Sequence, residues 1–291
     1  AAVRDALVAS GMPVVNVSFA LSETPFPRVG ADDLAVGETA ARHLVELALK
    51  SLACVGLPGL AFAERRVSGF HRFLRQSGLQ ARDLIQELKV AGKEDAWEVI
   101  GSERRLGEWL LTLPKPVGVF AVDDDEAFKL GYGARLMDLS VPDEVAILGV
   151  DDDELVCQSS NPPLSSVALP LEQIGYEAAA MLARWLDGET PPEEPMLLEP
   201  LGVTERESTN VLAVEDKEVA EALRFIRDHD DEPVRVSDVV ANATISRRVL
   251  EQRFKAAMGR TPLQEIRRVH VERAKELLAH TDLSIEDVAE R

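Results

Sequence analysis

The stretch Val145–Asp153, VAILGVDDD, carries the pattern that decides the fold of this 291-residue chain. Its first six residues are apolar or small, without polar alternation, and three aspartates follow directly. Residues 117–125, VGVFAVDDD, have the same form. A strand that is apolar on both faces indicates a parallel sheet covered by helices. Ligands of such sheets bind beyond the carboxyl ends of the strands, so these aspartates are the first candidates for a functional role.

Short apolar strands alternate with amphipathic helices from residue 12 to about residue 208. This alternation is typical of a doubly wound α/β domain. Strands are predicted at Val14–Ser18, Leu52–Leu57, Val117–Val122, Val145–Val150, Ser165–Leu169 and Met196–Val203. Helices are predicted at Leu34–Ala48, Ala63–Gln76, Asp95–Leu113, Asp125–Met137 and Leu171–Leu186.

A polar segment, 206–216, is the predicted linker. Beyond it the apolar residues have only helical spacing. Gly259 stands where a helix would end in a left-handed residue, and Thr261 with Gln264 forms a capping box for the next helix. The sequence therefore predicts an α/β domain at 1–205 and an all-α domain at 217–291. The predicted helices of the second domain are Lys217–Arg227, Val236–Asn242, Ile245–Met258, Pro262–Ala279 and Ile285–Glu290.

The composition indicates a cytoplasmic globular protein without cofactors. The mean hydropathy is −0.05, and no apolar run reaches the roughly 18 residues that a membrane span needs. The two cysteines, Cys54 and Cys157, give neither a disulfide framework nor a metal-binding pattern, so no metal is expected.

The charge is unevenly distributed along the chain. The net charge is −19, and residues 1–211 hold 18 Lys and Arg against 34 Asp and Glu. Residues 244–275 reverse this balance, with nine Lys and Arg against three Glu. A local excess of positive charge attracts phosphate, whereas the acidic remainder would repel nucleic acid. A nucleic-acid interface is therefore expected only in this stretch.

Residues 236–258 have the pattern of helix, turn and helix. In the second helix, apolar Val249, Leu250 and Phe254 are spaced to pack together. The opposite face presents four residues at positions i, i+3, i+4 and i+7, namely Arg248, Glu251, Gln252 and Lys255. Arg and Gln can pair with guanine and adenine edges, and Lys can meet phosphate. The open alternative is a helix whose charges are merely solvated.

A longer motif runs through this region: L-x-x-R-F-K-x-x-x-G-R-T-P at 250–262, RAKELL at 273–278 and TDLSIEDVA at 281–289. It resembles the AraC/XylS family of transcription factors, which carries two helix-turn-helix units joined by a long helix. The resemblance implies that Pro262–Ala279 is the connecting helix and that the second unit is truncated. We therefore expect this chain to bind DNA poorly.

The same resemblance implies a role for each residue of the first reading helix. Base-reading positions match Arg248, Glu251 and Gln252. The backbone-contacting end matches Ser246 and Arg247, and Ser246 can also cap the helix and offer its amide end to a phosphate.

The α/β domain carries its own set of motifs, which are PVVNV (13–17), VGADDLAVG (29–37), AARHL (40–44), RVSGF (66–70), FAVDD (120–124), ILGVDD (147–152) and PPLSSV (162–167). They resemble the sugar-sensing domain of LacI/GalR regulators, a two-lobed fold of the periplasmic-binding-protein type. The resemblance implies that the first lobe is incomplete here, so we expect a chain truncated at both ends.

The resemblance also implies a sugar pocket formed by Asp32, Arg66, Trp97, Asp123 and Asp151. Carboxylates accept hydrogen bonds from sugar hydroxyls, a guanidinium donates them, and an aromatic ring covers the C–H face. Some alternatives stay open: Arg66 as a structural ion pair and Trp97 as a core residue. The remaining aspartates of the two clusters are interpreted as helix caps and surface acids, and these are Asp124, Asp125, Asp152 and Asp153.

A LacI-like sensor ahead of an AraC-type module is the order found in xylose-operon regulators, which the junction at 203–209 also resembles. This resemblance implies D-xylose as effector, promoter or operator DNA as partner, a homodimer, and RNA polymerase as a candidate contact. Two alternatives remain: a sugar-binding module without a regulatory role, and a metal-dependent enzyme that uses the aspartate clusters. The second lacks a G-x-S-x-G, an H-E-x-x-H or a glycine-rich phosphate loop, so no enzyme is expected.

Overall fold

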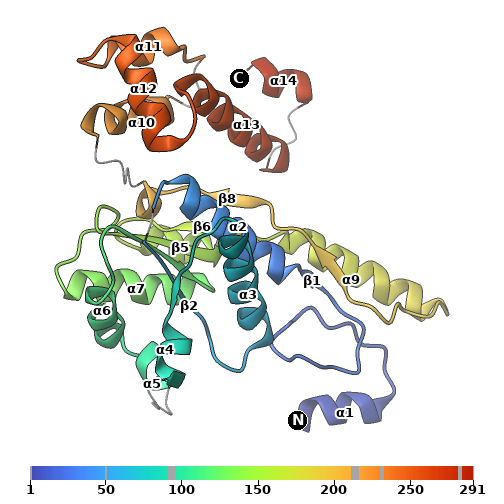
Figure 1. Cartoon of the computed structure of the whole chain (residues 1–291). Coiled ribbons are helices and arrows are strands. Elements are labelled where there is room, and N and C mark those ends of the chain that lie inside the picture. Colours follow the sequence, from blue (N-terminus) through green and yellow to red (C-terminus); the bar gives the residue numbers. More distant parts are fainter. Residues whose placement is uncertain are drawn as a thin grey trace. The chain divides into compact units, whose positions relative to one another are not determined.

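The computed structural model of the chain describes residues 2–49, 51–90, 96–210, 216–229, 233–280 and 284–290. The chain forms two compact units (Figure 1). The α/β unit comprises Ala1–His43 and Ser51–Thr209, and the helical unit comprises Leu44–Lys50 and Asn210–Arg291.

A six-stranded sheet forms the centre of the α/β unit. In spatial order its strands are β3 (Arg82–Asp83), β2 (Ser51–Val55), β4 (Val117–Ala121), β5 (Val145–Asp151), β6 (Ser165–Ala168) and β8 (Gly202–Thr204). The first five are parallel, and β8 is antiparallel to β6. The predicted parallel sheet, with its buried central strands, is confirmed.

Helices cover both faces of this sheet. On one face, α4 (Leu84–Val90), α6 (Glu103–Leu111) and α7 (Asp124–Leu136) bury an apolar core against β2, β4 and β5. On the other face, Phe70 of α3 (Ala61–Gln76) stacks on Phe120 of β4 at 5.0 Å between ring centroids. Close packing on both sides explains why the central strands lack polar residues.

Two glycines let α2 (Asp33–Glu46) cross α3 at backbone contact. A Cβ atom on Gly37 would lie 1.9 Å from the carbonyl oxygen of Arg66, and one on Gly69 would lie 2.0 Å from that of Leu34. No side chain fits at either position. The crossing fixes the segment of α3 from which Arg66 extends.

A second, two-stranded sheet pairs β1 (Val29–Ala31) with β7 (Met196–Leu198), and α9 (Leu171–Leu186) packs against it. The chain crosses between the two sheets three times: at Asp32, at Leu169–Pro170 and at Glu199–Leu201. Two sheets joined by such short connections agree with the predicted two-lobed fold, in which connecting segments act as hinges. Because β6 leads directly into one crossing, the carboxyl edge of the large sheet is the edge next to the small one.

Three predictions about elements of the α/β unit were wrong. Residues 14–18 form no strand and contribute only an isolated bridge between Asn16 and Arg28. The helix predicted over 95–113 is broken into α5 (Ala96–Ile100) and α6, because Ser102 caps α6 by accepting a hydrogen bond from Arg105 N. The strand predicted over 196–203 is split by a crossing that contains Pro200, which has no N–H to donate to a ladder.

Three further short elements belong to the described part of the α/β unit. They are α1 (Ala2–Ser10), α8 (Glu154–Ser159) and the 3₁₀ helix η1 (Glu207–Thr209). The sequence pattern had not indicated α8, because only the capping carboxylate of Asp153 marks its beginning.

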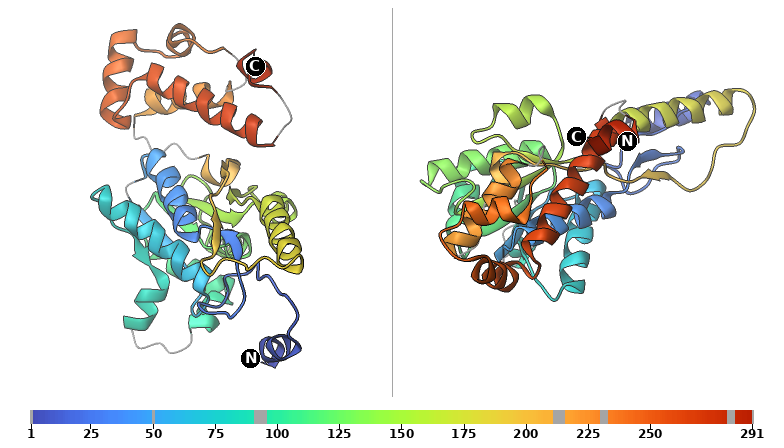
Figure 2. Two further views of the ribbon diagram at one scale, coloured as in Figure 1. Left: turned by 90° about the vertical axis from the view of Figure 1, so that its right-hand side faces the viewer. Right: turned by 90° about the horizontal axis from the view of Figure 1, so that it is seen from above.

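The described part of the helical unit after residue 215 contains helices without strands, coloured from orange to red in Figure 2. They are α10 (Lys217–Asp228), α11 (Val236–Ala241), α12 (Arg247–Met258), α13 (Pro262–His280) and α14 (Ile285–Glu290). As predicted, Gly259 ends α12 with φ of 70°. Thr261 and Gln264 form the predicted capping box of α13, with Thr261 N donating to Gln264 Oε1 at 2.8 Å.

Candidate functional site

Arg66 connects three elements at the carboxyl edge of the large sheet. Its buried guanidinium donates from Nε to Asp33 Oδ1 (2.9 Å) and from Nη1 to the carbonyl oxygen of Val122 (2.6 Å). Nη1 also lies 3.3 Å from Asp151 Oδ1. The guanidinium lies over the Phe62 ring, with Arg66 Cζ 4.9 Å from the ring centroid. The start of α2 is thereby tied to the ends of β4 and β5.

Burial governs the protonation of the carboxyl groups around Arg66. It raises the pKa of Asp33, although the adjacent guanidinium works against the rise. It raises the pKa of Asp151 to about 6, with Arg66 opposing and the negative charges of Asp124 and Asp123 adding to the effect. The side chain of Asp151 is 40% exposed, so this is the carboxyl group of the cluster that solvent reaches most readily.

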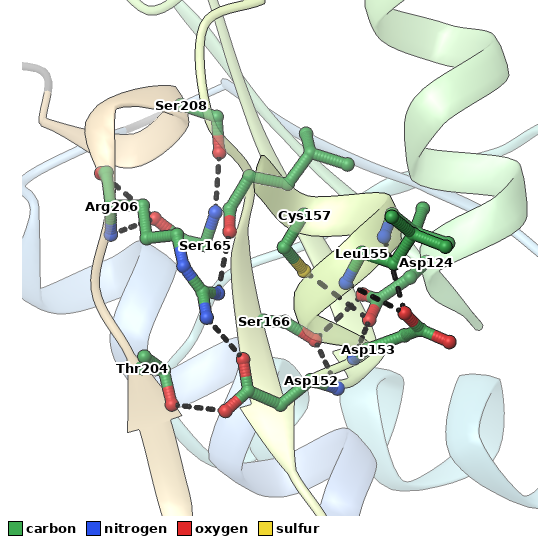
Figure 3. A network of polar contacts seen from close by, with 12 residues as sticks. Asp124, Asp152, Asp153, Leu155, Cys157, Ser165, Ser166, Thr204, Arg206 and Ser208 are labelled. Carbon is green, nitrogen blue, oxygen red and sulfur yellow. Dashed lines mark hydrogen bonds and ion pairs between the residues drawn. The ribbon is translucent and has the colours of Figure 1, made fainter. Parts of the chain in front are cut away.

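The backbone turns sharply at Asp151 and Asp152, whose φ angles are 109° and 56°. Positive φ is uncommon outside glycine, although aspartate tolerates it better than most residues. Three contacts hold Asp152 in this turn (Figure 3): its N–H donates to Ser166 Oγ, Thr204 Oγ1 donates to its Oδ2 at 2.7 Å, and Arg206 Nη2 lies 2.8 Å from its Oδ1. A strained turn held in place by its surroundings is a frequent feature of binding sites.

Asp124 is a buried centre of hydrogen bonds rather than the surface acid that we predicted. It accepts from Ser166 Oγ (2.6 Å), from the amide of Asp153 (2.8 Å) and from Cys157 Sγ (3.4 Å), as Figure 3 shows. Burial raises its pKa to about 6 despite these donors. A Cβ atom on Gly149 would lie 2.2 Å from its Oδ1, so only glycine leaves room for it. Asp124 thus fixes α7 against β5 and β6.

Asp32 and Asp123 both cap helices at the same edge. Asp32 Oδ1 accepts from the amide of Leu34 (3.0 Å), and Asp123 Oδ1 accepts from that of Glu126 (2.7 Å). Each cap uses one carboxylate oxygen. Asp153, which we predicted as a cap, does cap α8.

Trp97 lies on α5 with 51% of its surface exposed, which excludes the alternative of a core residue. Among the described residues, no hydrogen bond or ring contact joins it to Arg66 or the aspartates. Residues 91–95, directly before α5, are outside the described part of the chain. A stacking role for Trp97 therefore stays a prediction.

The end of the α/β unit lies within the segment that we predicted as linker. Ser208 and Thr209 are buried, and Thr209 Oγ1 donates to Ser165 Oγ at 2.6 Å. The compact unit therefore extends to Thr209. Of the predicted linker 206–216, residues 211–215 are outside the described residues.

The helix-turn-helix lies in α11 and α12 of the helical unit. Leu250 and Phe254 are fully buried on one side of α12, in a core that they share with α10, α11 and α13. Arg248, Gln252 and Lys255 are exposed. The structure thus separates an apolar side of α12 from a side that presents donors and positive charge.

The start of α12 differs from the prediction in one respect. Ser246 stands at the N-cap position, but its side chain makes no capping hydrogen bond. The turn before α12 is held from α10 instead, where Glu218 accepts hydrogen bonds from the amide and the hydroxyl of Thr244. Arg247 Nε pairs with Glu251 Oε1 at 2.9 Å along the surface of α12, so these two side chains restrain each other.

Two family models match this chain. A periplasmic binding protein-like domain covers residues 41–209, and a helix-turn-helix domain covers residues 239–291. The xylose operon regulatory protein of Escherichia coli (strain K12) is 33% identical over 295 residues, which span 99% of this chain and 74% of that protein. The chain belongs to the family of xylose operon regulators. The protein of this name from Haemophilus influenzae is 31% identical over 91% of this chain and 68% of its own.

Solved structures agree with this family of xylose operon regulators. The structure of a xylose-binding transcription activator is 32% identical, with a TM-score of 0.63, over 99% of this chain and 77% of that chain. A LacI family regulator from Enterococcus faecium with bound ribose shares the fold at 24% identity and a TM-score of 0.59, over 72% and 74% of the two chains.

Membership in the xylose operon regulators makes this chain a transcription regulator and not an enzyme, as expected from the sequence. Its α/β unit is the periplasmic-binding-protein-like part, and its helical unit carries the DNA-binding helix-turn-helix. Among the helices that the structure describes, none has the length and apolar character that crossing a bilayer requires.

Sequence reasoning missed several residues that contact Arg66 or hold the turn at Asp151 and Asp152. Asp33 is the closest ion partner of Arg66, and the Arg66 guanidinium lies over the ring of Phe62. Arg206 and Thr204 hold the turn after Asp151 from a distance of more than 50 residues. Phe62 stands one helical turn before Arg66, and this spacing was the one local signal available.

Proposed function

We propose that this chain is a regulator whose α/β unit binds D-xylose at the carboxyl edge of the large sheet and whose α12 reads operator DNA. Arg66 carries the proposal for the sugar. Its Nη2 makes no hydrogen bond to any described residue, while Nη1 lies 3.3 Å from the half-exposed carboxyl group of Asp151. A sugar hydroxyl both donates and accepts, so it matches a guanidinium and a carboxylate side by side.

Asp32 and Asp123 extend this polar edge. Each uses its Oδ1 as a helix cap, and we propose that its Oδ2 accepts from further hydroxyls of the sugar. In this proposal Trp97 covers the C–H face of the ring. The names of two relatives, a xylose operon regulatory protein and a xylose-binding transcription activator, support the choice of xylose.

For DNA, the proposal assigns base contacts to Arg248, Glu251 and Gln252. It assigns phosphate contacts to Lys255, Arg247 and the amide end of α12 at Ser246. The exposed donors of α12 lie opposite its buried residues, which is the orientation that a recognition helix needs. A homodimer would present two such helices to paired half-sites, and RNA polymerase is the contact through which bound protein would act.

A sugar titration of the chain tests the first half. Asp151→Asn should weaken D-xylose binding at least tenfold in isothermal titration calorimetry, because an amide cannot replace both acceptor oxygens. Asp125→Asn, an exposed change in the neighbouring acidic cluster, is the matched control and should bind as the wild type does. Equal affinities of the two variants would contradict the assigned pocket, and tighter binding of ribose or glucose would contradict the choice of xylose.

A DNA-binding measurement tests the assignment of α12, and it is made at low salt because low salt strengthens the poor binding that we expect of this chain. Arg248→Ala combined with Gln252→Ala should abolish sequence-dependent binding to a promoter fragment in fluorescence anisotropy. Arg253→Ala is the control on the same helix, because that guanidinium pairs with Asp216 at 3.3 Å. If the double variant and the control bound alike, the chain would be a sugar-binding module with no regulatory role through α12.

A further inference from the structure

Three side chains with metal-binding chemistry meet at the edge of the large sheet, away from Arg66. Cys54 comes from β2, His71 from α3 and Asp83 from β3. Cys54 and Asp83 are direct neighbours in the strand pairing, so their side chains leave the same face of the sheet, and α3 places His71 over that face. Sequence spacing gave no sign of this group, because its members are 17 and 12 residues apart.

Two of the three separations between their ligand atoms match those of a tetrahedral site. Cys54 Sγ lies 3.6 Å from His71 Nε2, and Nε2 lies 3.4 Å from Asp83 Oδ2. Zinc bonds of about 2.3 Å to sulfur and about 2.0 Å to nitrogen and oxygen, at tetrahedral angles, would separate these atoms by about 3.6 and about 3.3 Å. All three ligand atoms lie within 4.8 Å of one another. The two separations from His71 Nε2 therefore match a shared zinc ion, and the third, between Cys54 Sγ and the Asp83 carboxylate, is no more than 4.8 Å.

The charges around the thiol favour a cation. Cys54 is fully buried, and the carboxylates of Asp83 and Glu87 place negative charge near its thiol. Without a positive ion, the thiolate would face two negative groups. Glu87 is itself held by Arg82 at 2.6 Å and by Trp109 Nε1 at 3.2 Å, so it stays outside the ligand set.

Two other roles fit this group less well. As a nucleophile Cys54 would need access to a substrate, but its surface is completely covered. In a plain hydrogen-bonded cluster, the single atom His71 Nε2 would have to bond both the thiol and the carboxylate. Metal coordination uses all three groups at once. The side chains of His71 and Asp83 are 22% and 13% exposed, which leaves a path for an ion from solvent at the edge strand.

We propose that Cys54, His71 and Asp83 bind one Zn²⁺ ion, with water as the fourth ligand. One thiolate, one imidazole and one carboxylate form a donor set that zinc accepts readily and that calcium and magnesium avoid. Binding would release the thiol proton to solvent. The ion would join α3 to β2 and β3, and α3 is the helix that carries Arg66. The site would therefore act as a structural clamp of the α/β unit.

Cobalt provides a direct readout that does not depend on sugar or DNA binding. The whole chain, stripped of metal with a chelator, should take up one equivalent of Co²⁺ with tetrahedral d–d bands and a thiolate-to-cobalt charge-transfer band. Zn²⁺ should displace the Co²⁺ and erase both. Cys54→Ser should abolish the charge-transfer band. Cys157→Ser removes the chain's other thiol, also buried, and should leave the spectrum unchanged.

A second variant guards against misfolding of the first. Asp83→Asn keeps the shape of a partly exposed side chain and should weaken Zn²⁺ binding at least tenfold in competition with a chromophoric chelator. Circular dichroism of each variant reports whether the fold is retained. The proposal is overturned if the wild type takes up no Co²⁺, if the bound ion shows no thiolate band, or if Asp83→Asn binds Zn²⁺ as tightly as the wild type.

Discussion

Arg66 and Asp33 form an almost completely buried ion pair, with Nε and Oδ1 2.9 Å apart and side chains that are 6% and 3% exposed. Removing Asp33 leaves the buried guanidinium with only the half-exposed carboxyl group of Asp151, 3.3 Å away, as an ion partner. Breaking a buried ion pair costs about 3–5 kcal/mol in comparable cases. We expect Asp33→Ala to lower the free energy of unfolding by about that amount in urea denaturation. Glu38→Ala breaks the solvent-exposed pair with Arg72 between the same two helices and should have a much smaller effect. Equal losses would show that burial of the first pair is unimportant.

The close crossing of α2 and α3 leads to a second prediction about stability. Gly69→Ala would place a methyl group 2.0 Å from the carbonyl oxygen of Leu34, so the helices must separate. Overpacking of this kind costs about 1–3 kcal/mol or more. Gly175→Ala in α9 is the control, because nothing lies within 4 Å of the new Cβ and alanine is the better helix former. Thermal unfolding should show a lower Tm for the first and an unchanged or higher Tm for the second.

The repeating pattern of apolar strands predicted the parallel sheet correctly because burial on both faces leaves a strong signal. The apolar pattern fails to predict a strand where the strand depends on pairing with a neighbour. Residues 14–18 are as apolar as a strand but find no ladder partner beyond one bridge. The two residues of β3 are polar, and they are a strand only because β2 lies alongside.

The residues of the candidate site show the same difference between local patterns and contacts with distant segments. Carboxylates that follow a strand could be found from the sequence, because strand ends and helix caps are local features. Asp33, in contrast, differs from its neighbour Asp32 in that the buried Arg66 donates to it, and no local pattern distinguishes the two aspartates. Asp124 became the buried aspartate because Gly149 and Ser166, from two other strands, leave space and a donor for it.

The pKa of Asp151 predicts how stability depends on pH. In the folded chain this pKa is about 6, against an ordinary value of 3.8. Between the two values the folded state keeps a proton that the unfolded state has released. The stabilising contribution is therefore complete below about pH 3.8 and is lost as the pH rises through about 6.

Removing this carboxyl group should change the slope in a defined direction. We expect Asp151→Asn to make the decline in unfolding free energy between about pH 4 and about pH 7 shallower than in the wild type, measured by urea denaturation at each pH. Asp125→Asn should keep the wild-type slope. An unchanged or steeper decline in Asp151→Asn would mean that its carboxyl group is already charged in the folded state across this range.

Substitutions of exposed residues on α12 should have two different effects on DNA binding, one on its salt dependence and one on its sequence specificity. Lys255 is assigned to a phosphate, so Lys255→Ala should weaken binding to every sequence alike and reduce the slope of log affinity against log salt by about 1. Arg248 is assigned to a base edge, so Arg248→Ala should cost about 1–3 kcal/mol and relax discrimination at one base pair. Anisotropy titrations at several salt concentrations, with promoter DNA and a scrambled duplex, separate the two effects. If Arg248→Ala weakened binding to both duplexes equally, α12 would contact only the DNA backbone, because a base contact must distinguish one sequence from another.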